Sequence, residues 1–113
     1  MISIFKMKNK SYDRFFINFA NRERLRILYL LKEKPLSVNE IIKALGEEQS
    51  RVSHNLRKLW ACNLVNVKKE GKKRVYSLNN RAVLSILSLA KEHVNKFCSG
   101  ECKKDEIQKS LSR

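Results

Sequence analysis

Three patterns along the chain predict a mainly α-helical domain with one small β-hairpin. Two short amphipathic segments, residues 37–46 and 47–60, follow each other closely and have helical apolar spacing. Residues 65–78 then alternate apolar and polar side chains around a central turn, and residues 79–97 return to helical spacing. A tight helix pair followed directly by a hairpin predicts a winged helix-turn-helix with the element order α-α-α-α-β-β-α.

Length and charge limit the classes of function. With 113 residues the chain is expected to form one domain, residues 1–113, small enough that dimerisation would help to bury its apolar surface. The net charge of +14 and the pI of about 10.1 indicate a polyanionic partner, with nucleic acid the first choice and an anionic membrane surface the second. A membrane-surface protein would carry its cations along one amphipathic helix, whereas here they lie on a hairpin and a capped helix.

We expect neither a membrane span nor a secretory signal in this sequence. No apolar run approaches the ~18 residues of a membrane span, and Lys6 comes too early for a secretory signal. Three cysteines without framework spacing fit a reducing compartment. We therefore expect a cytoplasmic protein without a membrane partner, with a basic tail at residues 1–10 and a charged tail at residues 98–113.

An aromatic stripe predicts the first helix. Tyr12, Phe15, Phe16 and Phe19 recur at helical spacing and give this segment more apolar bulk than a short peripheral helix needs. The stripe suits either the core of the domain or a contact with a second copy of the chain.

Two further helices have clear ends in the sequence. The second helix is expected to begin at Asn21 and to end before Pro35, because the residue that precedes a proline avoids helical angles. The third helix is expected to begin with a capping box, in which the Ser37 hydroxyl caps the helix and Glu40 reaches back to the Ser37 amide. Gly46 is placed to end it.

The helix expected over residues 47–60 presents two different faces. Val52, Leu56, Leu59 and Trp60 form one apolar stripe for the core. The opposite side carries hydrogen-bond donors, which is typical of a helix that enters the major groove of DNA. The residues expected to contact DNA from this helix are Gln49, Ser50, Arg51, Ser53, His54, Arg57 and Lys58.

The predicted hairpin has a basic tip. Cations surround its Glu70-Gly71 turn, and Glu70 is the one acid among them. Such a turn is either simply solvated or in contact with phosphates, and this density of cations exceeds what solubility requires. The residues expected to contact the DNA backbone are Lys68, Lys69, Lys72, Lys73 and Arg74.

The last helix is expected to follow an Asn79-Asn80 cap and to reach Phe97. Its apolar residues recur at steps of three and four, the spacing of a seam that packs against a partner helix. Because so small a domain does not cover both this seam and the aromatic stripe, we expect a homodimer. The expected interface residues are Phe15, Phe16, Phe19, Ile86, Leu87, Ala90 and Phe97.

Three stretches of the chain carry a resemblance to a known family. They are Q-S-R-V-S-H-N-L-R-K-L followed by N-L-V, the hairpin K-K-E-G-K-K-R-V-Y-S-L, and F-A-N-R-E-R-L-R-I-L-Y-L-L in the second helix. Together they resemble the arsenic- and zinc-sensing winged-helix repressors of the ArsR/SmtB family, over about residues 12–97. The resemblance implies a homodimer joined through its first and last helices. It also implies binding to an imperfect promoter palindrome, with repression relieved when an effector changes the shape of the dimer.

The resemblance also implies two kinds of effector site, neither of which this chain preserves. The family's thiolate site uses cysteines early in the third helix, where this chain has Ser37 and Asn39. The family's other site lies across the last helices of two subunits and uses a carboxylate and histidines. Its matching positions here are Asn80, Ala82, His93 and Lys96. One ligand of four remains, whereas zinc needs roughly four donors, and His93 is better interpreted as an interface residue.

Two cysteines four positions apart, Cys98 and Cys102, are the one feature that could replace these effector sites. They fit a metal-binding pair, a small disulfide loop, or two tail residues without a role. Two thiolates are too few for a closed zinc or arsenite site, so a third donor would come from the partner subunit or from Cys62, which we expect to be buried. We interpret the pair as a thiol-based metal or redox sensor, and the cofactor stays unknown.

Enzymatic functions find no support in the sequence, which has no Gly-rich phosphate loop and no H-E-x-x-H motif. The favoured function is that of a sequence-specific regulator that binds double-stranded DNA as a homodimeric repressor. The alternative is an effector-independent or non-specific nucleic-acid-binding protein, either nucleoid-like or RNA-binding. Competition between a palindromic and a random duplex separates the two.

Overall fold

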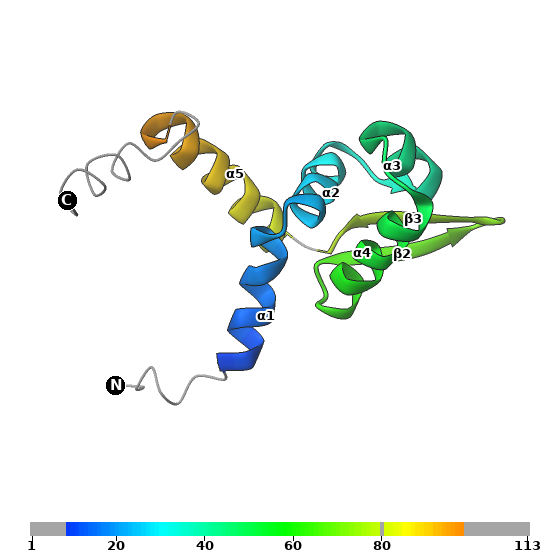
Figure 1. Ribbon diagram of the computed structural model, residues 1–113, viewed down its shortest axis with the longest axis horizontal. Helices are drawn as coiled ribbons and strands as arrows, with labels where there is room; N and C mark the ends of the chain where they lie inside the picture. The colour runs from blue at the N-terminus through cyan, green and yellow to red at the C-terminus, as the bar shows by residue number, and fades with distance from the viewer. Residues whose placement is uncertain (1–8, 80, 99–113) are drawn as a thin grey trace, which may run out of the picture.

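The computed structural model describes residues 9–79 and 81–98, which form five helices and a three-stranded sheet. The elements are α1 (Asn9–Ala20), α2 (Arg22–Glu33), β1 (Leu36–Ser37), α3 (Val38–Leu45), α4 (Gln49–Ala61), β2 (Val65–Glu70), β3 (Lys73–Leu78) and α5 (Arg81–Phe97). Figure 1 shows α2, α3, α4 and the sheet gathered in one head, from which α1 and α5 extend on the side opposite the hairpin tip. The predicted winged helix-turn-helix is confirmed, with β1 as an additional strand.

The sheet is antiparallel in the order β1-β3-β2, so the central strand is the second strand of the hairpin. Leu36 and Ser37 of β1 pair with Tyr76 and Val75 of β3. The sequence did not predict β1, because two residues are too few to show the alternation of a strand. Its effect is to tie the middle of β3 to the start of α3.

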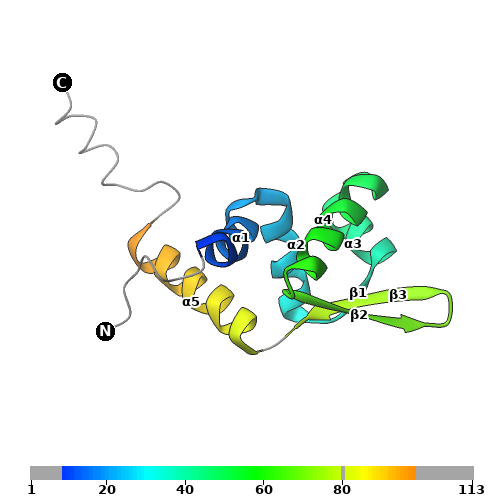
Figure 2. The same ribbon diagram turned by 90° about the horizontal axis from the view of Figure 1, so that it is seen from below.

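The core lies between α2, α3, α4 and the base of the hairpin, and α5 closes one end of it. Figure 2 shows the hairpin projecting from this body on one side while α1 and α5 project on the other. Each helix contributes one apolar stripe with helical spacing, as the periodicity of the sequence predicts. The buried apolar residues are Ile27, Leu28, Leu31, Leu36, Ile41, Val52, Leu56, Leu59, Leu64, Val65, Val83 and Leu87.

The predicted capping of α3 is confirmed, and α2 has a side-chain cap as well. Asn21 accepts a hydrogen bond from the amide of Arg24 at 3.0 Å. Ser37 and Glu40 form the complete capping box, with 3.2 Å from the Glu40 amide to the Ser37 hydroxyl and 2.9 Å from the Ser37 amide to the Glu40 carboxylate. The hydrogen bond from the Ser37 amide lowers the pKa of Glu40 below its ordinary value of 4.5. Gly46 ends α3 in the left-handed conformation, with φ of 66°.

Two boundaries differ in detail from the sequence prediction. Helix α1 begins at Asn9, inside the segment 1–10 that we expected to be a tail. The side chain of Asn79 donates to the carbonyl of Asn63 at 2.6 Å instead of capping α5. Asn80 and the segments 1–8 and 99–113 lie outside the described residues, so the cap by Asn80 stays a prediction.

Two apolar residues lie on a different side from the one we expected. Trp60 does not complete the buried stripe of α4, because 53% of it is exposed. Leu59 already faces the core, and the next residue of a helix points about 100° away. Leu87 does not belong to the outer seam of α5, because it is 0% exposed and lies in the core of the protomer.

Candidate nucleic-acid interface

The exposed face of α4 lies opposite its core contacts. Leu56 and Leu59 are fully buried against the rest of the head. At about 100° per residue, Ser50, His54 and Arg57 project to the opposite side, and all three are exposed. The structure therefore places these predicted DNA contacts together on one accessible helix face.

A basic groove runs between the start of α3, the α4 helix and the hairpin. It has a volume of about 530 Å³. Four of its lining residues are cations and none is an acid, so the groove attracts an anionic chain. The lining residues are Ser37, Val38, Asn39, Gln49, Ser53, Arg57, Lys72, Lys73, Arg74 and Tyr76. Gln49 and Ser53 thus face the hairpin side of α4, and Arg57 belongs both to the groove and to the exposed helix face.

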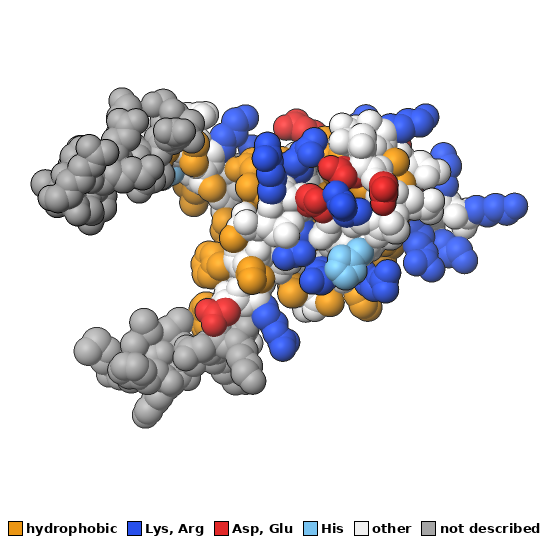
Figure 3. Space-filling view, viewed as in Figure 1, with side chains coloured by type: hydrophobic (Ala, Val, Ile, Leu, Met, Phe, Trp, Pro, Cys, Tyr) orange, Lys and Arg blue, Asp and Glu red, His pale blue; other side chains and the backbone are white. Residues whose placement is uncertain are grey.

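The hairpin holds like charges close together. Lys69 and Arg74 lie directly opposite each other across the two strands, and both are exposed. Like charges in this arrangement destabilise a strand pair. Glu70 lies opposite Lys73 and balances one cation only. Figure 3 shows Lys and Arg side chains over the hairpin end of the molecule, while hydrophobic side chains gather at the α1 and α5 end. An anion bound along the hairpin would relieve the repulsion.

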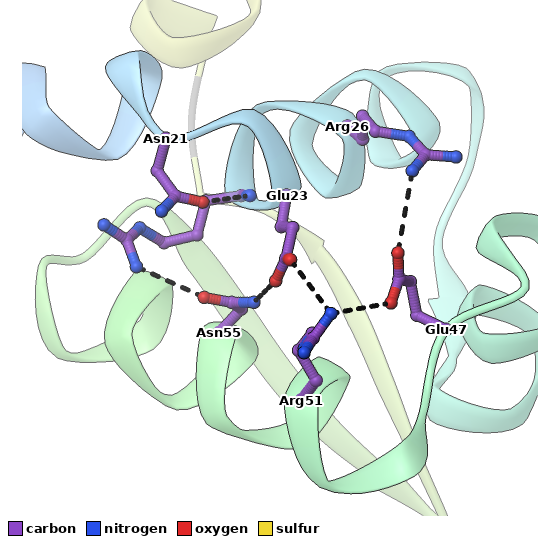
Figure 4. A network of polar contacts seen from close by, with 7 residues as sticks. Asn21, Glu23, Arg26, Glu47, Arg51 and Asn55 are labelled. Carbon is purple, nitrogen blue, oxygen red and sulfur yellow. Dashed lines mark hydrogen bonds and ion pairs between the residues drawn. The ribbon is translucent and has the colours of Figure 1, made fainter.

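Arg51 does not share the groove with the other predicted contacts. Its Nη1 atom lies 3.5 Å from Oε1 of Glu23 in α2 and 3.4 Å from Oε2 of Glu47, just before α4 (Figure 4). Glu47 also lies 3.9 Å from the guanidinium of Arg26. Lys58, another predicted contact, is exposed on α4 but does not line the groove. Gln49, Ser53 and Arg57 line the groove, and Ser50 and His54 share the exposed face with Arg57, whereas Arg51 does not line the groove and is paired with two carboxylates.

Two polar residues on the core side of α4 were not predicted from the sequence. Asn55 lies on the buried side of α4 and is 5% exposed, and Arg24 of α2 is 8% exposed. Nη1 of Arg24 donates to Oδ1 of Asn55 at 3.2 Å. The sequence could have indicated Asn55 by its position, because it lies three residues after Val52 and four before Leu59, inside an otherwise apolar stripe.

The predicted dimer residues fall into different environments. Phe15 and Phe19 are half-buried against the protomer core, and their ring centroids are 5.1 Å apart. Phe16 and Phe97 are well exposed, Ala90 is exposed and Ile86 is half-buried. The same two helices carry further exposed apolar residues that are not in the list of expected interface residues. These are Tyr12, Ile17, Leu84, Leu89 and Val94.

No group of three or more His, Cys, Asp or Glu residues suited to a metal occurs within residues 9–79 and 81–98. His93 is exposed, and its ring lies 5.0 Å from that of Phe97. Cys62, expected to be buried, is half-buried beside the core, and Cys98 is half-buried just after α5. Cys102 lies outside the described residues, so the thiol sensor stays a prediction. Among the described helices, none is long and apolar enough to cross a membrane.

Comparison with known proteins identifies the family. Residues 21–67 match the family described as bacterial regulatory protein, arsR family. The HTH-type transcriptional regulator NmtR of Mycobacterium tuberculosis is 42% identical over 74 residues, which are 66% of this chain and 62% of that protein. The crystal structure of NolR from Sinorhizobium fredii is similar with a TM-score of 0.72 and 30% identity, over 81% of this chain and 93% of that one. The chain belongs to the arsR family.

The arsR-family match spans the helix-turn-helix from α2 to the start of β2. A third relative is the homodimeric winged helix-turn-helix DNA-binding domain Mb0332 from Mycobacterium bovis, with a TM-score of 0.73 and 25% identity over 83% of this chain and 92% of that one. The chain spans about three fifths of the length of curated relatives such as NmtR. The family and NmtR are described as regulators, which agrees with the expectation that the protein is not an enzyme.

Proposed function

We propose that this arsR-family protein binds double-stranded DNA as a homodimer and represses transcription at a promoter palindrome. The observation that carries the proposal is the continuity of the exposed face of α4 with the basic groove, since Arg57 belongs to both. Major-groove base edges would meet Ser50, His54 and Arg57, while the DNA backbone would follow the groove to the hairpin.

The apolar faces of α1 and α5 support the homodimer. Phe16 and Phe97 are large, exposed and carried by helices that extend away from the head. Exposed apolar surface of this kind marks an interaction site. The relative Mb0332 is described as homodimeric. Two heads are also what a palindrome requires, with half-sites about 34 Å apart.

The test measures the affinity of the protein for two labelled DNA duplexes by fluorescence anisotropy. One duplex carries a twofold-symmetric candidate operator chosen from the DNA next to the protein's own gene, and the other carries the same bases scrambled. We expect tighter binding to the repeat by roughly 10³-fold or more, with affinity falling steeply between about 50 and 200 mM salt. Equal affinity for both duplexes would favour the non-specific nucleic-acid binder. Sedimentation of the free protein as a monomer at micromolar concentration would contradict the homodimer.

Two substitutions distinguish the residues that contact bases from the residues that contact the DNA backbone. Arg57→Ala is expected to cost about 1 to 3 kcal/mol on the palindrome and to reduce the preference over the scrambled duplex. Lys72→Ala is expected to weaken both duplexes alike and to reduce the salt slope by about one. The docking would be wrong if Lys72→Ala changed the sequence preference while Arg57→Ala did not.

Release of the DNA by a thiol-reactive signal stays part of the proposal and rests on Cys98 and Cys102. Its test compares DNA affinity of the wild type and the Cys98→Ser/Cys102→Ser variant in the presence of zinc, arsenite or peroxide. Loss of affinity in the wild type alone would support the sensor. A wild type that is indifferent to all three would leave a constitutive repressor.

A further inference from the structure

Five polar residues join α2 to the recognition helix α4 on the side away from the groove (Figure 4). Nη1 of Arg24 donates to Oδ1 of Asn55 at 3.2 Å, and Nδ2 of Asn55 donates to Oε2 of Glu23 at 2.9 Å. Nη1 of Arg51 lies 3.5 Å from Oε1 of Glu23 and 3.4 Å from Oε2 of Glu47. We refer to these five residues as the α2–α4 clamp.

The buried half of the clamp fixes the orientation of α4. The side-chain amide of Asn55 uses its oxygen for a guanidinium and its nitrogen for a carboxylate, so both ends are satisfied in one orientation. Apolar contacts tolerate small rotations of a helix, whereas a buried amide between two charged groups does not. Nε of Arg24 has no hydrogen-bond partner among the described residues, so breaking the contact with Asn55 would leave a second donor of the same buried group unpaired.

The exposed half of the clamp lies on the flank of α4 that faces α2. Arg51 and Asn55 are four residues apart, which places them on the same side of the helix. At about 100° per residue, Arg51 points about 120° away from Arg57, which lines the groove. The Arg51 guanidinium also lies between two carboxylates at nearly equal distances. A base contact by Arg51 would therefore require it to leave both partners.

The positive charge of Arg51 suggests how it affects DNA binding from this position. Glu23 and Glu47 are carboxylates beside the start of the recognition helix, where they would repel the phosphates of an approaching duplex. We propose that Arg51 is a positioning residue of the α2–α4 clamp that raises DNA affinity by neutralising Glu23 and Glu47, and not by reading bases. The inference rests on the proposed function, and it replaces the base contact that the sequence predicts for Arg51.

The test is a mutant cycle on the two duplexes described above. Arg51→Ala is expected to weaken the palindrome and the scrambled duplex by the same factor, about 3- to 10-fold, so that the preference between them is unchanged. In a Glu23→Gln/Glu47→Gln background, Arg51→Ala is expected to weaken either duplex clearly less than in the wild type, because only the direct attraction between Arg51 and the phosphates is then lost. Thermal unfolding of every variant checks that the domain is folded.

A conservative variant and a matched control separate neutralisation from base reading. Arg51→Lys keeps the positive charge but loses the planar fork, so it is expected to restore wild-type affinity to within about twofold. Arg57 is the control on the same helix. Arg57→Ala is expected to reduce the sequence preference, Arg57→Lys to leave it reduced, and both effects to be unchanged in the Gln background.

Four outcomes would overturn the inference. They are a reduced sequence preference in Arg51→Ala, an Arg51→Lys variant as weak as Arg51→Ala, an Arg51→Ala effect that is undiminished in the Gln background, and no effect of Arg51→Ala at all. Failure of the proposed function would look different, because the wild type itself would then show no preference for the palindrome. The scrambled duplex would still test the clamp in that case, since neutralisation acts on any duplex.

Discussion

The roles of the two faces of α5 can be distinguished by making the same substitution at two positions, one on each face. Leu87 is 0% exposed and Leu89 is 63% exposed, although both are leucines on the same helix. Residues two apart on a helix point about 160° away from each other. Leu87→Ala and Leu89→Ala are therefore a matched pair, one in the protomer core and the other on the proposed dimer face.

The size of the two effects follows from this burial. Leu→Ala removes three carbon atoms, at about 0.8 kcal/mol each when fully buried, and it leaves a cavity that adds to the loss. Leu87→Ala should therefore lower the free energy of unfolding by about 3 to 5 kcal/mol. That is a large share of the roughly 5 to 15 kcal/mol that stabilises a domain. Leu89→Ala should lower the stability of an isolated protomer by less than about 1 kcal/mol.

Urea unfolding followed by circular dichroism, at two protein concentrations, measures both effects. We expect Leu87→Ala to lower the midpoint at both concentrations, because it acts within the protomer. Leu89→Ala should act mainly through the monomer–dimer equilibrium, so its effect depends on concentration, and sedimentation should show more monomer. The assignment of the two faces would be refuted if Leu89→Ala destabilised a dilute, monomeric protein as strongly as Leu87→Ala.

Three further predictions concern α3. Ser37→Ala should lower the free energy of unfolding in urea by about 1 kcal/mol through loss of the cap, and an unchanged midpoint would contradict the capping box. The lowered pKa of Glu40 means that its contribution is present above its ordinary pKa of 4.5 and is lost as the pH falls through the lower folded value. The difference in melting temperature between wild type and Glu40→Gln should thus be greatest near neutral pH and disappear in acid. Gly46→Ala should cost about 1 to 2 kcal/mol in urea because of φ alone, since an added Cβ has no atom within 4 Å.

Features set by neighbouring residues could be predicted from the sequence. The capping box joins Ser37 and Glu40 within one helical turn, and Gly46 ends the same eight-residue helix. The hairpin follows from alternation around a glycine, and Gly71 indeed has a positive φ of 62°. In each case the physical cause lies within a few residues of its effect, so a single stretch of sequence contains it.

Features set by distant residues could not be predicted in the same way. Trp60 and Leu87 both fit an apolar pattern, but periodicity does not show which apolar side chain meets the core when a helix carries more of them than one face holds. Arg51 was assigned to DNA because it lies on a donor-rich helix, and the carboxylate of Glu23 that holds it is 28 positions away. Strand β1 could not be predicted for the same reason, since its partner Val75 is distant in the sequence.

Ser37 belongs to two elements at once, and this limits how the protein can change shape. It pairs with Val75 in the sheet while its side chain caps α3. A hairpin that swung independently would have to break that pairing, right beside the capped start of α3. We therefore expect the head to turn as a rigid body, with the joints at its connections to α1 and α5. An effector of the proposed homodimeric regulator would then act by changing the distance and angle between two unchanged heads, and crosslinks across the dimer would detect it where probes within one head would not.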